Sequence, residues 1–180
     1  MKFSIKDREA IRKKLVACAA RFGGLISQVD YYFSHPSRDY LKTDEALRLR
    51  KSGQKVVITW KGPRADAASK TRREIELPLG GRELSSHQTI LDWTDMLASL
   101  GFQKVFEVEK RRQPVRVHWR GSELDVAIDH VKNLGEFMEI ELQAKQTEVV
   151  EAQDVIRSFA EELGYSNEEK RSYLELLFFK

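Results

Sequence analysis

The sequence has little of several features that define whole classes of protein. It contains a single cysteine, Cys18, in 180 residues. One cysteine cannot form an internal disulfide, so a disulfide-stabilised scaffold is excluded and the reducing cytosol is the expected compartment. No apolar run approaches the roughly 20 residues that a membrane-spanning helix requires. With no signal peptide before the first expected helix, we expect no membrane partner and a cytoplasmic protein.

An excess of one charge sign is also lacking. The chain has 31 basic and 28 acidic residues, a formal net charge of +3. A dedicated nucleic-acid-binding domain usually carries a strong basic surface, so this balance disfavours a nucleic-acid partner. What is present is a globular composition, with 41% apolar and 33% charged residues. The length suits one hydrophobic core, and we expect a single domain over residues 1–180.

Hydrophobic periodicity predicts helices and short strands in alternating groups. The sequence Lys51-Ser52-Gly53-Gln54 predicts a hairpin turn, and Gln113-Pro114 predicts a connection between two strands. The predicted helices are Asp7–Phe22, Ser86–Leu100, Val149–Leu163 and Glu168–Phe179. The predicted strands are Leu25–Phe33, Glu45–Arg50, Lys55–Lys61, Thr71–Leu79, Phe102–Arg112, Val115–Arg120, Glu123–Val131 and Glu136–Ala144.

Most of these strands place charge on one face. Side chains alternate between the two faces of a strand, so Arg48 and Arg50 share one face and Glu139 and Glu141 share another. For one strand alone, a half-solvated sheet is the simplest explanation. Across the chain, however, basic pairs and acidic pairs fall on different strands. If the sheet curls with this face inward, basic strands would surround an anion and acidic strands would bind Mg²⁺ or Mn²⁺. A metal-bound triphosphate needs both kinds of ligand.

This ordered pattern resembles the CYTH domain of the triphosphate tunnel metalloenzymes. That family includes class IV adenylyl cyclases, thiamine triphosphatases and inorganic triphosphatases. The segment QVDYYF (28–33), with its following loop, is most similar to the cyclase-like branch. The LG-F-EIE pattern is the most specific piece of the resemblance. The matching segments are QVDYYF (28–33), EALRLR (45–50), ITWKGP (58–63), RREIE (72–76), EVEKRR (107–112), AIDHVKNLGEFMEIE (127–141) and SYLELL (172–177).

The resemblance implies an α+β fold, in which about eight antiparallel strands close into a barrel-shaped tunnel with flanking helices. It also implies roles for individual residues. Asp129, Glu139 and Glu141 match catalytic carboxylates that bind Mg²⁺ or Mn²⁺. Asp30 matches the strand scaffold near the tunnel mouth. The residues that match substrate-binding positions are Lys2, Arg48, Arg50, Lys61, Arg72, Glu74, Glu76, Lys110 and Arg112.

The sequence departs from the family pattern at its beginning. The family's first strand carries Glu-x-Glu-x-Lys, and its two glutamates complete the metal site. Here Lys2 and Phe3 match the lysine and the apolar residue after it, so both glutamates would lie before Met1. We hypothesise that translation starts upstream, which in-frame upstream codons would test. If Met1 is the true start, the metal site lacks two carboxylates.

The resemblance implies metal-dependent chemistry on ATP, inorganic triphosphate or thiamine triphosphate. A cyclase would use the ribose 3′-hydroxyl to attack the α-phosphate, whereas a triphosphatase would use water to attack a terminal phosphate. The same charged cage serves both reactions, so the sequence leaves the branch open. A binding module that holds a nucleotide or polyphosphate without turnover is the alternative, and a homodimer stays open.

Overall fold

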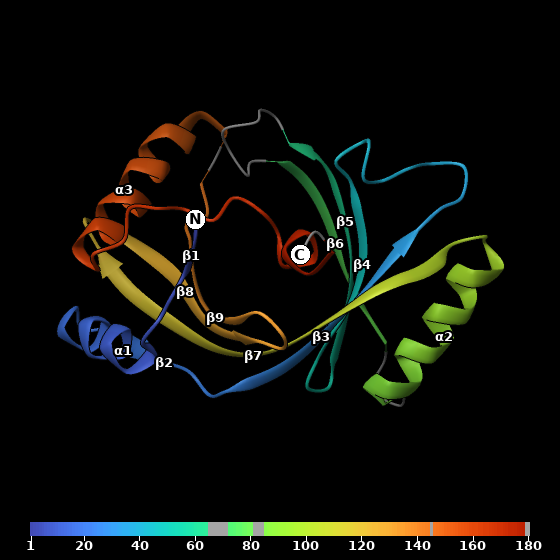
Figure 1. Cartoon of the computed structure of the whole chain (residues 1–180), viewed down its shortest axis with the longest axis horizontal. Helices are drawn as coiled ribbons and strands as arrows, with labels where there is room; N and C mark the ends of the chain where they lie inside the picture. Colours follow the sequence, from blue (N-terminus) through green and yellow to red (C-terminus); the bar gives the residue numbers. More distant parts are fainter. Residues whose placement is uncertain (65–71, 81–84, 145, 179–180) are drawn as a thin grey trace. The chain divides into compact units, whose positions relative to one another are not determined.

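The computed structural model describes residues 1–64, 72–80, 85–144 and 146–178 of an α+β chain. Helices and strands come in the alternating groups that the periodicity predicts (Figure 1). The described strands are β1 Lys2–Ser4, β2 Arg21–Phe22, β3 Ile26–Ser34, β4 Ala46–Ser52, β5 Lys55–Arg64, β6 Arg72–Leu79, β7 Gln103–Trp119, β8 Ser122–Val131 and β9 Gly135–Glu141. The described helices are α1 Arg8–Ala17, α2 Ser86–Ser99, α3 Val149–Glu162 and α4 Tyr173–Phe178, with a 3₁₀ turn at Gln146–Glu148.

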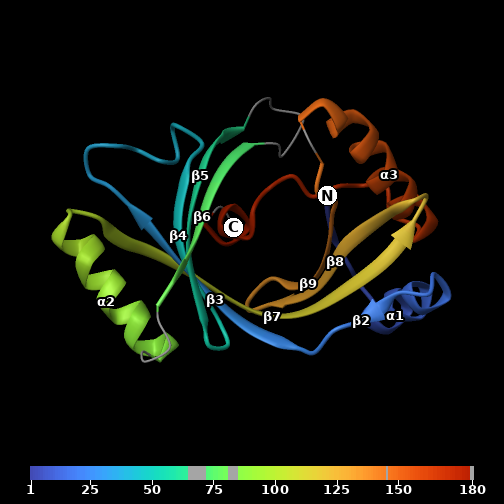
Figure 2. The same cartoon turned by 180° about the vertical axis from the view of Figure 1, so that it is seen from behind.

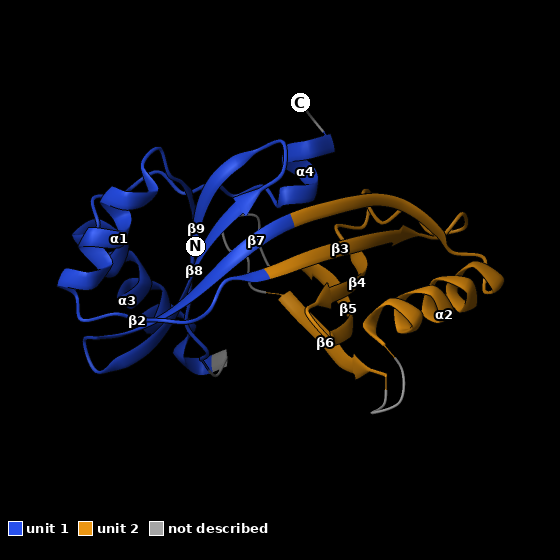
Figure 3. Cartoon of the chain, turned by 90° about the horizontal axis from the view of Figure 1, so that it is seen from below, with its two compact units in different colours: residues 1–26, 110–180 blue, residues 27–109 orange. Residues whose placement is uncertain are grey.

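The chain divides into two compact units, which Figure 3 colours separately. Unit 1 contains residues 1–26 and 110–180, and unit 2 contains residues 27–109. Strand β7 has residues in both ranges. Every strand pair for which the structure gives a register is antiparallel. Closure of the strands into a barrel, and a single domain over residues 1–180, both stay predictions.

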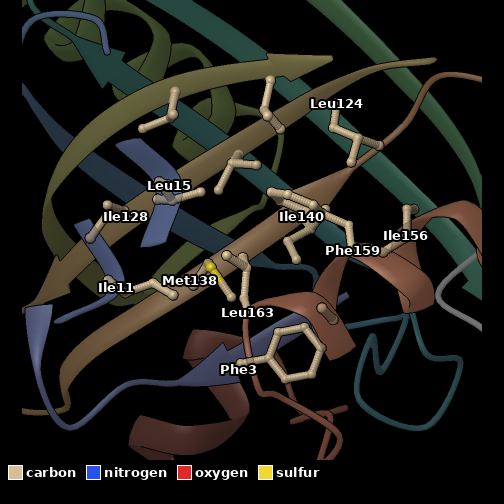
Figure 4. Packing of buried hydrophobic residues seen from close by; sticks show 14 of the residues in the cluster. Phe3, Ile11, Leu15, Leu124, Ile128, Met138, Ile140, Ile156, Phe159 and Leu163 are labelled. Atoms are coloured by element: carbon tan, nitrogen blue, oxygen red, sulfur yellow. The ribbon is translucent and has the colours of Figure 1, made fainter. Parts of the chain in front are cut away.

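In unit 1 the strand order is β1-β9-β8-β7, and the short strand β2 also pairs with β7 (Figure 2). Its apolar face packs against α1 and α3, and Figure 4 shows that core at close range. Ile11 and Leu15 stand four residues apart on α1, the spacing that places two side chains on one helix face, and both are buried. The opposite face of the same strands therefore carries the charged side chains.

Helix α1 ends earlier than the sequence predicts. Asp7 caps its start, because its Oδ1 accepts a hydrogen bond from the Ala10 N–H at 3.0 Å. The helix stops at Ala17, and Ala19 has a φ of +55°, in the left-handed region that ends helices. Arg21 and Phe22 then form β2 instead of the last helical turn. The prediction of helix up to Phe22 is therefore wrong.

Strand β7 is one continuous strand of 17 residues, so the prediction of two strands joined at Gln113-Pro114 is also wrong. The N–H and C=O groups of one residue in an antiparallel strand point to the same side. The carbonyl of Pro114 accepts from the Gly23 N–H at 2.8 Å. The missing N–H of Pro114 therefore faces Gly23 and removes no ladder hydrogen bond to β8, where Pro114 pairs with Ala127.

In unit 2 the described strand order is β3-β4-β5-β6, with β7 next to β3. The predicted hairpin joins β4 and β5, and Gly53 adopts the φ of +58° that its turn requires. The apolar face of these strands packs against Ile90 and Leu97 of α2. Their other face carries the predicted basic pair of β4.

Helix α4 begins five residues later than predicted. A reciprocal capping box sets its start: the Ser172 Oγ accepts from the Glu175 N–H at 3.1 Å, and Glu175 Oε2 accepts from the Ser172 N–H at 2.5 Å. Before it, the Glu169 N–H donates to the Lys2 carbonyl at 2.7 Å, which holds that segment against β1. Two ends of predicted elements, Thr71 and Phe179, lie outside the described residues. No helix in the described part of the chain is long and apolar enough to cross a bilayer.

Candidate active site

The charged face of unit 1 brings five of the predicted residues together. Their side chains alternate with core residues along four strands. Antiparallel register places Lys2 opposite Glu139 and Arg112 opposite Asp129. Lys110 lies one strand repeat from Arg112 on the same face. Three cations and two carboxylates thus share one side of the sheet, opposite the hydrophobic core.

Arg112 is bound on two sides by carboxylates. Its Nε and Nη2 donate to the two oxygens of Asp129 at 2.7 Å and 2.6 Å, and Nη2 also donates to Glu139. Lys110 Nζ lies 3.5 Å from Asp129 Oδ2. Burial alone would raise the pKa of Glu139, but the charges of Arg112, Lys110 and Lys2 outweigh it and lower the pKa to about 2. Glu139 is therefore ionised at neutral pH.

Tyr173 of α4 completes this cluster. Its hydroxyl donates to Asp129 Oδ2 at 3.0 Å. The ammonium groups of Lys2 and Lys110 lie 4.2 Å and 5.1 Å from the centre of its ring, within cation–π range. Lys2 Nζ also donates to the carbonyl of Arg171. Burial, reinforced by the charges of Glu139 and Asp129, raises the pKa of the Tyr173 phenol, so the hydroxyl keeps its proton. The sequence signal for this residue was SYLELL, which gave no role to the tyrosine.

Replacing Tyr173 by phenylalanine is expected to lower the free energy of unfolding by about 1.5–3 kcal/mol, the usual contribution of a hydrogen bond to a charged group. Urea unfolding followed by circular dichroism would measure it. Tyr165→Phe is a matched control, because no hydrogen bond of the Tyr165 hydroxyl is among the described interactions. If both variants unfold at the same urea concentration, the bond to Asp129 does not stabilise the fold.

A pocket of about 660 Å³ lies on this face of unit 1. Arg112, Glu139 and Glu141 contribute to its wall. Glu141 is exposed, and it pairs across β8 and β9 with Asp125, which also lines the pocket. The pocket is therefore lined by Arg112 together with carboxylates that differ in how exposed they are.

The carboxylates of β9 fit Mg²⁺ or Mn²⁺ in part. Hard divalent cations prefer carboxylate oxygens, and Mg²⁺ is commonly bound by one or two carboxylates together with substrate phosphates. Glu139 and Glu141 supply two such groups on one strand face. Within the described ranges, no group of three or more Asp, Glu, His or Cys side chains is placed to hold a metal by itself. Asp129 is fully buried and accepts from three donors, which disfavours its predicted metal role.

In unit 2 the basic pair of β4 is anchored by Asp30. Arg50 donates to both Asp30 oxygens at 2.6 Å and 2.7 Å, and the Nη1 atom of Arg48 lies 3.5 Å from Asp30 Oδ2. Arg48 is only 7% exposed, and its Nε has no hydrogen-bond partner among the described residues. A buried guanidinium N–H without a partner is costly. This arrangement leaves Arg48 with a donor that a bound anion could satisfy.

The remaining predicted residues of unit 2 have three separate sets of partners. Glu76 accepts from the Thr59 hydroxyl at 3.2 Å, and Thr59 accepts from Arg48 at 3.3 Å, so Glu76 belongs to the Arg48 chain of contacts. Lys61 donates to Glu74 at 2.6 Å. Arg72 instead donates to the carbonyls of Asp44 and Gly62, each at 3.3 Å. The structure therefore gives Arg72 different partners from the basic pair of β4.

The chain is similar to known proteins over most of its length. The family model described as "CYTH domain" matches residues 1–173. A curated relative, the putative adenylate cyclase MJ0240 of Methanocaldococcus jannaschii, is 29% identical over 181 residues, which cover 98% of this chain and 95% of the relative.

Solved structures match over nearly the whole chain. The PH1819 protein of Pyrococcus horikoshii OT3 is 34% identical with a TM-score of 0.82, covering 99% of this chain and 96% of that one. A putative adenylyl cyclase from Hippeastrum, HpAC1, described as having a dominant triphosphatase activity, is 19% identical with a TM-score of 0.63. It covers 100% of this chain and 95% of its own, and at that identity it supports the fold alone.

Proposed function

Because the chain belongs to the CYTH domain family, we propose that it is a metal-dependent enzyme that acts on a triphosphate. We propose further that its strands close into the charged β-barrel expected of this family. The reaction is either cyclisation of ATP with release of pyrophosphate or hydrolysis of a triphosphate. The name of the Methanocaldococcus relative supports the first branch, and the second stays open because the same charged cage serves both reactions.

The observation that carries this proposal is the position of Arg112. Its guanidinium lies in the wall of the unit 1 pocket, between buried Asp129 and Glu139 of β9. Asp129 orients it by two parallel hydrogen bonds, the geometry that gives arginine its preference for carboxylates and phosphates. A fixed cation next to Glu139 and Glu141 is suited to phosphate and a divalent ion together.

The chain's own residues would then act mainly by position and charge. Arg112, Lys110 and Lys2 would neutralise phosphate oxygens, and Asp129 would hold Arg112 and Lys110 in place. Glu139 and Glu141 would bind Mg²⁺ or Mn²⁺, which when bound supplies Lewis-acid polarisation of a phosphate. Fixed cations of this kind stabilise the charge that moves along the phosphates in the transition state.

In unit 2, Arg48→Gln is expected to weaken the binding of inorganic triphosphate about 10–100-fold. A charge-assisted hydrogen bond contributes roughly 1.5–3 kcal/mol, and every 1.4 kcal/mol is about a tenfold change in Kd. Calorimetry with EDTA present would measure the affinity without turnover. Lys55→Gln removes an exposed cation of β5 and is the control. Equal affinities for the two variants would contradict a role for Arg48 in anion binding.

A substrate panel tests the proposed function itself. ATP, inorganic triphosphate and thiamine triphosphate would each be supplied with Mg²⁺ or Mn²⁺, and cyclic AMP, pyrophosphate and phosphate would be measured. Cyclic AMP with equimolar pyrophosphate identifies a cyclase, and phosphate release identifies a triphosphatase. The absence of any product from all three substrates with both metals would overturn the proposal.

The second candidate is a module that binds a nucleotide or polyphosphate without converting it. It is favoured by one observation: the described part of the chain groups fewer than three metal-ligating side chains at any one place. Calorimetric binding of ATP or triphosphate, with no product after long incubation, would support this candidate over the enzyme.

A further inference from the structure

Two residues in the floor of the unit 1 pocket, next to Arg112 and Glu139, are uncharged. On β7 the next residue of the same face is Pro114, and its partner on β8 is Ala127. Both line the pocket together with the charged residues. The two residues form a pair without mutual ladder hydrogen bonds, in which side chains lie closest across an antiparallel sheet. They therefore make an apolar patch between the charged side chains that β7 and β8 carry on this face.

Charge resumes on both sides of this patch along β7 and β8. Along β7, Pro114 stands between Arg112 and Arg116, and along β8, Ala127 stands between Asp129 and Asp125. All four flanking side chains lie on the pocket face by strand alternation. A surface that bound only phosphate and metal would gain nothing from two uncharged residues at its centre. The interruption suggests a ligand that is not charged throughout.

The patch is kept low and flat by its neighbours. A Cβ atom on Gly23 would lie 2.9 Å from Cγ of Pro114, so only glycine permits this contact without movement of the ring. Ala127 has the smallest side chain that a strand position normally carries, and it faces the open volume. The small side chain preserves room for a ligand.

The volume agrees with an organic ligand. Sites for small organic molecules and cofactors usually measure roughly 300–1,000 Å³ and combine apolar walls with a few polar groups. The pocket of about 660 Å³ lies within this range. Inorganic triphosphate consists of charged oxygens and would leave the apolar floor uncovered. A triphosphate that carries a planar organic group would cover it while its phosphates reach Arg112.

We propose that Pro114 and Ala127 form the subsite for the organic group of the substrate, which is a nucleoside triphosphate rather than inorganic triphosphate. This inference rests on the proposed function, because it places the phosphates at Arg112 and the neighbouring cations. A planar group over the patch would remove apolar surface from water, which favours binding of the ligand that carries it. The patch would distinguish substrates by their organic group, whereas the cations would bind the triphosphate that all of them carry.

Filling the patch tests the inference. Ala127→Leu places three more carbon atoms over the floor, and ATP binding measured by calorimetry in EDTA is expected to weaken at least about tenfold. Inorganic triphosphate should keep its affinity within about twofold, because its contacts are with the cations. Ala17→Leu makes the same change at an exposed position of α1 and should alter neither affinity. Ala127→Val, a smaller change that suits a strand, serves if the leucine variant does not fold.

The outcomes separate the two proposals. A selective loss of ATP binding supports the subsite. Unchanged binding of both ligands by folded Ala127→Leu or Ala127→Val protein overturns the subsite and leaves the proposed function standing. The same holds if the unmodified protein binds inorganic triphosphate but not ATP. If the unmodified protein binds neither ligand, the proposed function fails and the subsite fails with it. Thiamine triphosphate as a third ligand shows whether another organic triphosphate replaces ATP, which would overturn the assignment to a nucleoside.

Discussion

Replacing Asp129 by asparagine is expected to lower the free energy of unfolding by about 3–5 kcal/mol, because removal of one partner leaves buried cations without compensation. The Asp129 side chain is fully buried, and the side chains of Lys110 and Arg112 are 2% and 17% exposed. Asparagine keeps the size of the side chain but loses its charge. Urea unfolding at neutral pH would measure the difference.

Asp125→Asn is the matched control for this prediction. Asp125 lies on the same strand and the same face, but its side chain is 57% exposed and its ion pair with Arg116 is a surface pair. Such pairs contribute roughly 0–1 kcal/mol. We therefore expect little change for Asp125→Asn. A loss below about 1 kcal/mol for Asp129→Asn would show that its charge does not hold the cluster together.

Replacing Glu139 by glutamine is expected to reduce turnover about 100- to 1,000-fold with the fold intact. A divalent ion contributes several kcal/mol to transition-state stabilisation, and each 1.36 kcal/mol is about a tenfold change in rate. Steady-state rates with the substrate and metal identified by the panel would measure the effect. Glu123→Gln, an exposed change on β8, is the control and should keep the full rate.

Binding distinguishes this loss of turnover from unfolding. Glu139 accepts a hydrogen bond from Arg112 and so competes with an anion for it. Neutralising Glu139 should therefore leave the binding of triphosphate in EDTA unchanged or make it stronger. The variant should therefore bind its substrate and fail to convert it. Unaltered metal-dependent turnover in Glu139→Gln would falsify the assignment of Glu139 to the reaction.

The same cluster can rearrange when an anion enters. Arg112 donates through Nε and Nη2 to Asp129 and Glu139, so a phosphate that binds these two nitrogens has to share or replace one of the two carboxylates. Asp129 is the less exposed of the two, and Lys110 and Tyr173 also bind it. The contact with Glu139 is therefore the one that can be exchanged. Arg112 would turn from Glu139 to the substrate, which would release that carboxylate for a metal ion.

The sequence predicts the parts of this site that depend on strand periodicity. Arg48 with Arg50, and Glu139 with Glu141, share faces because side chains alternate along any strand. Those pairs needed no knowledge of neighbouring strands. The partners of Asp129 could not be found in this way, because they depend on the register of β7 against β8. Tyr173 joins it from 44 residues further along the chain.

The wrong predictions of helix and strand ends have the same origin, because they too depend on which strands pair. Pro114 looks like a strand end in sequence, and only the position of Gly23 shows that its missing N–H costs no ladder bond. The helix predicted to reach Phe22 has suitable apolar spacing, but pairing of β2 with β7 outweighs local preference there. The resemblance places Asp30 in the strand scaffold. In the structure Asp30 accepts two hydrogen bonds from Arg50, so this scaffold residue contacts the basic pair of β4 directly.

The continuity of β7 has a consequence for how this gene can vary. A one-residue shift in a strand exchanges the side chains of its two faces. Insertion of a single codon near Glu109 would place Arg111 where Arg112 stands, deletion of one would place Gln113 there, and either change would turn Val115 out of the core. A change of two codons would preserve the faces but move Arg112 away from Asp129. We therefore expect length variation among related genes to fall in the turns, and β7 to keep its length.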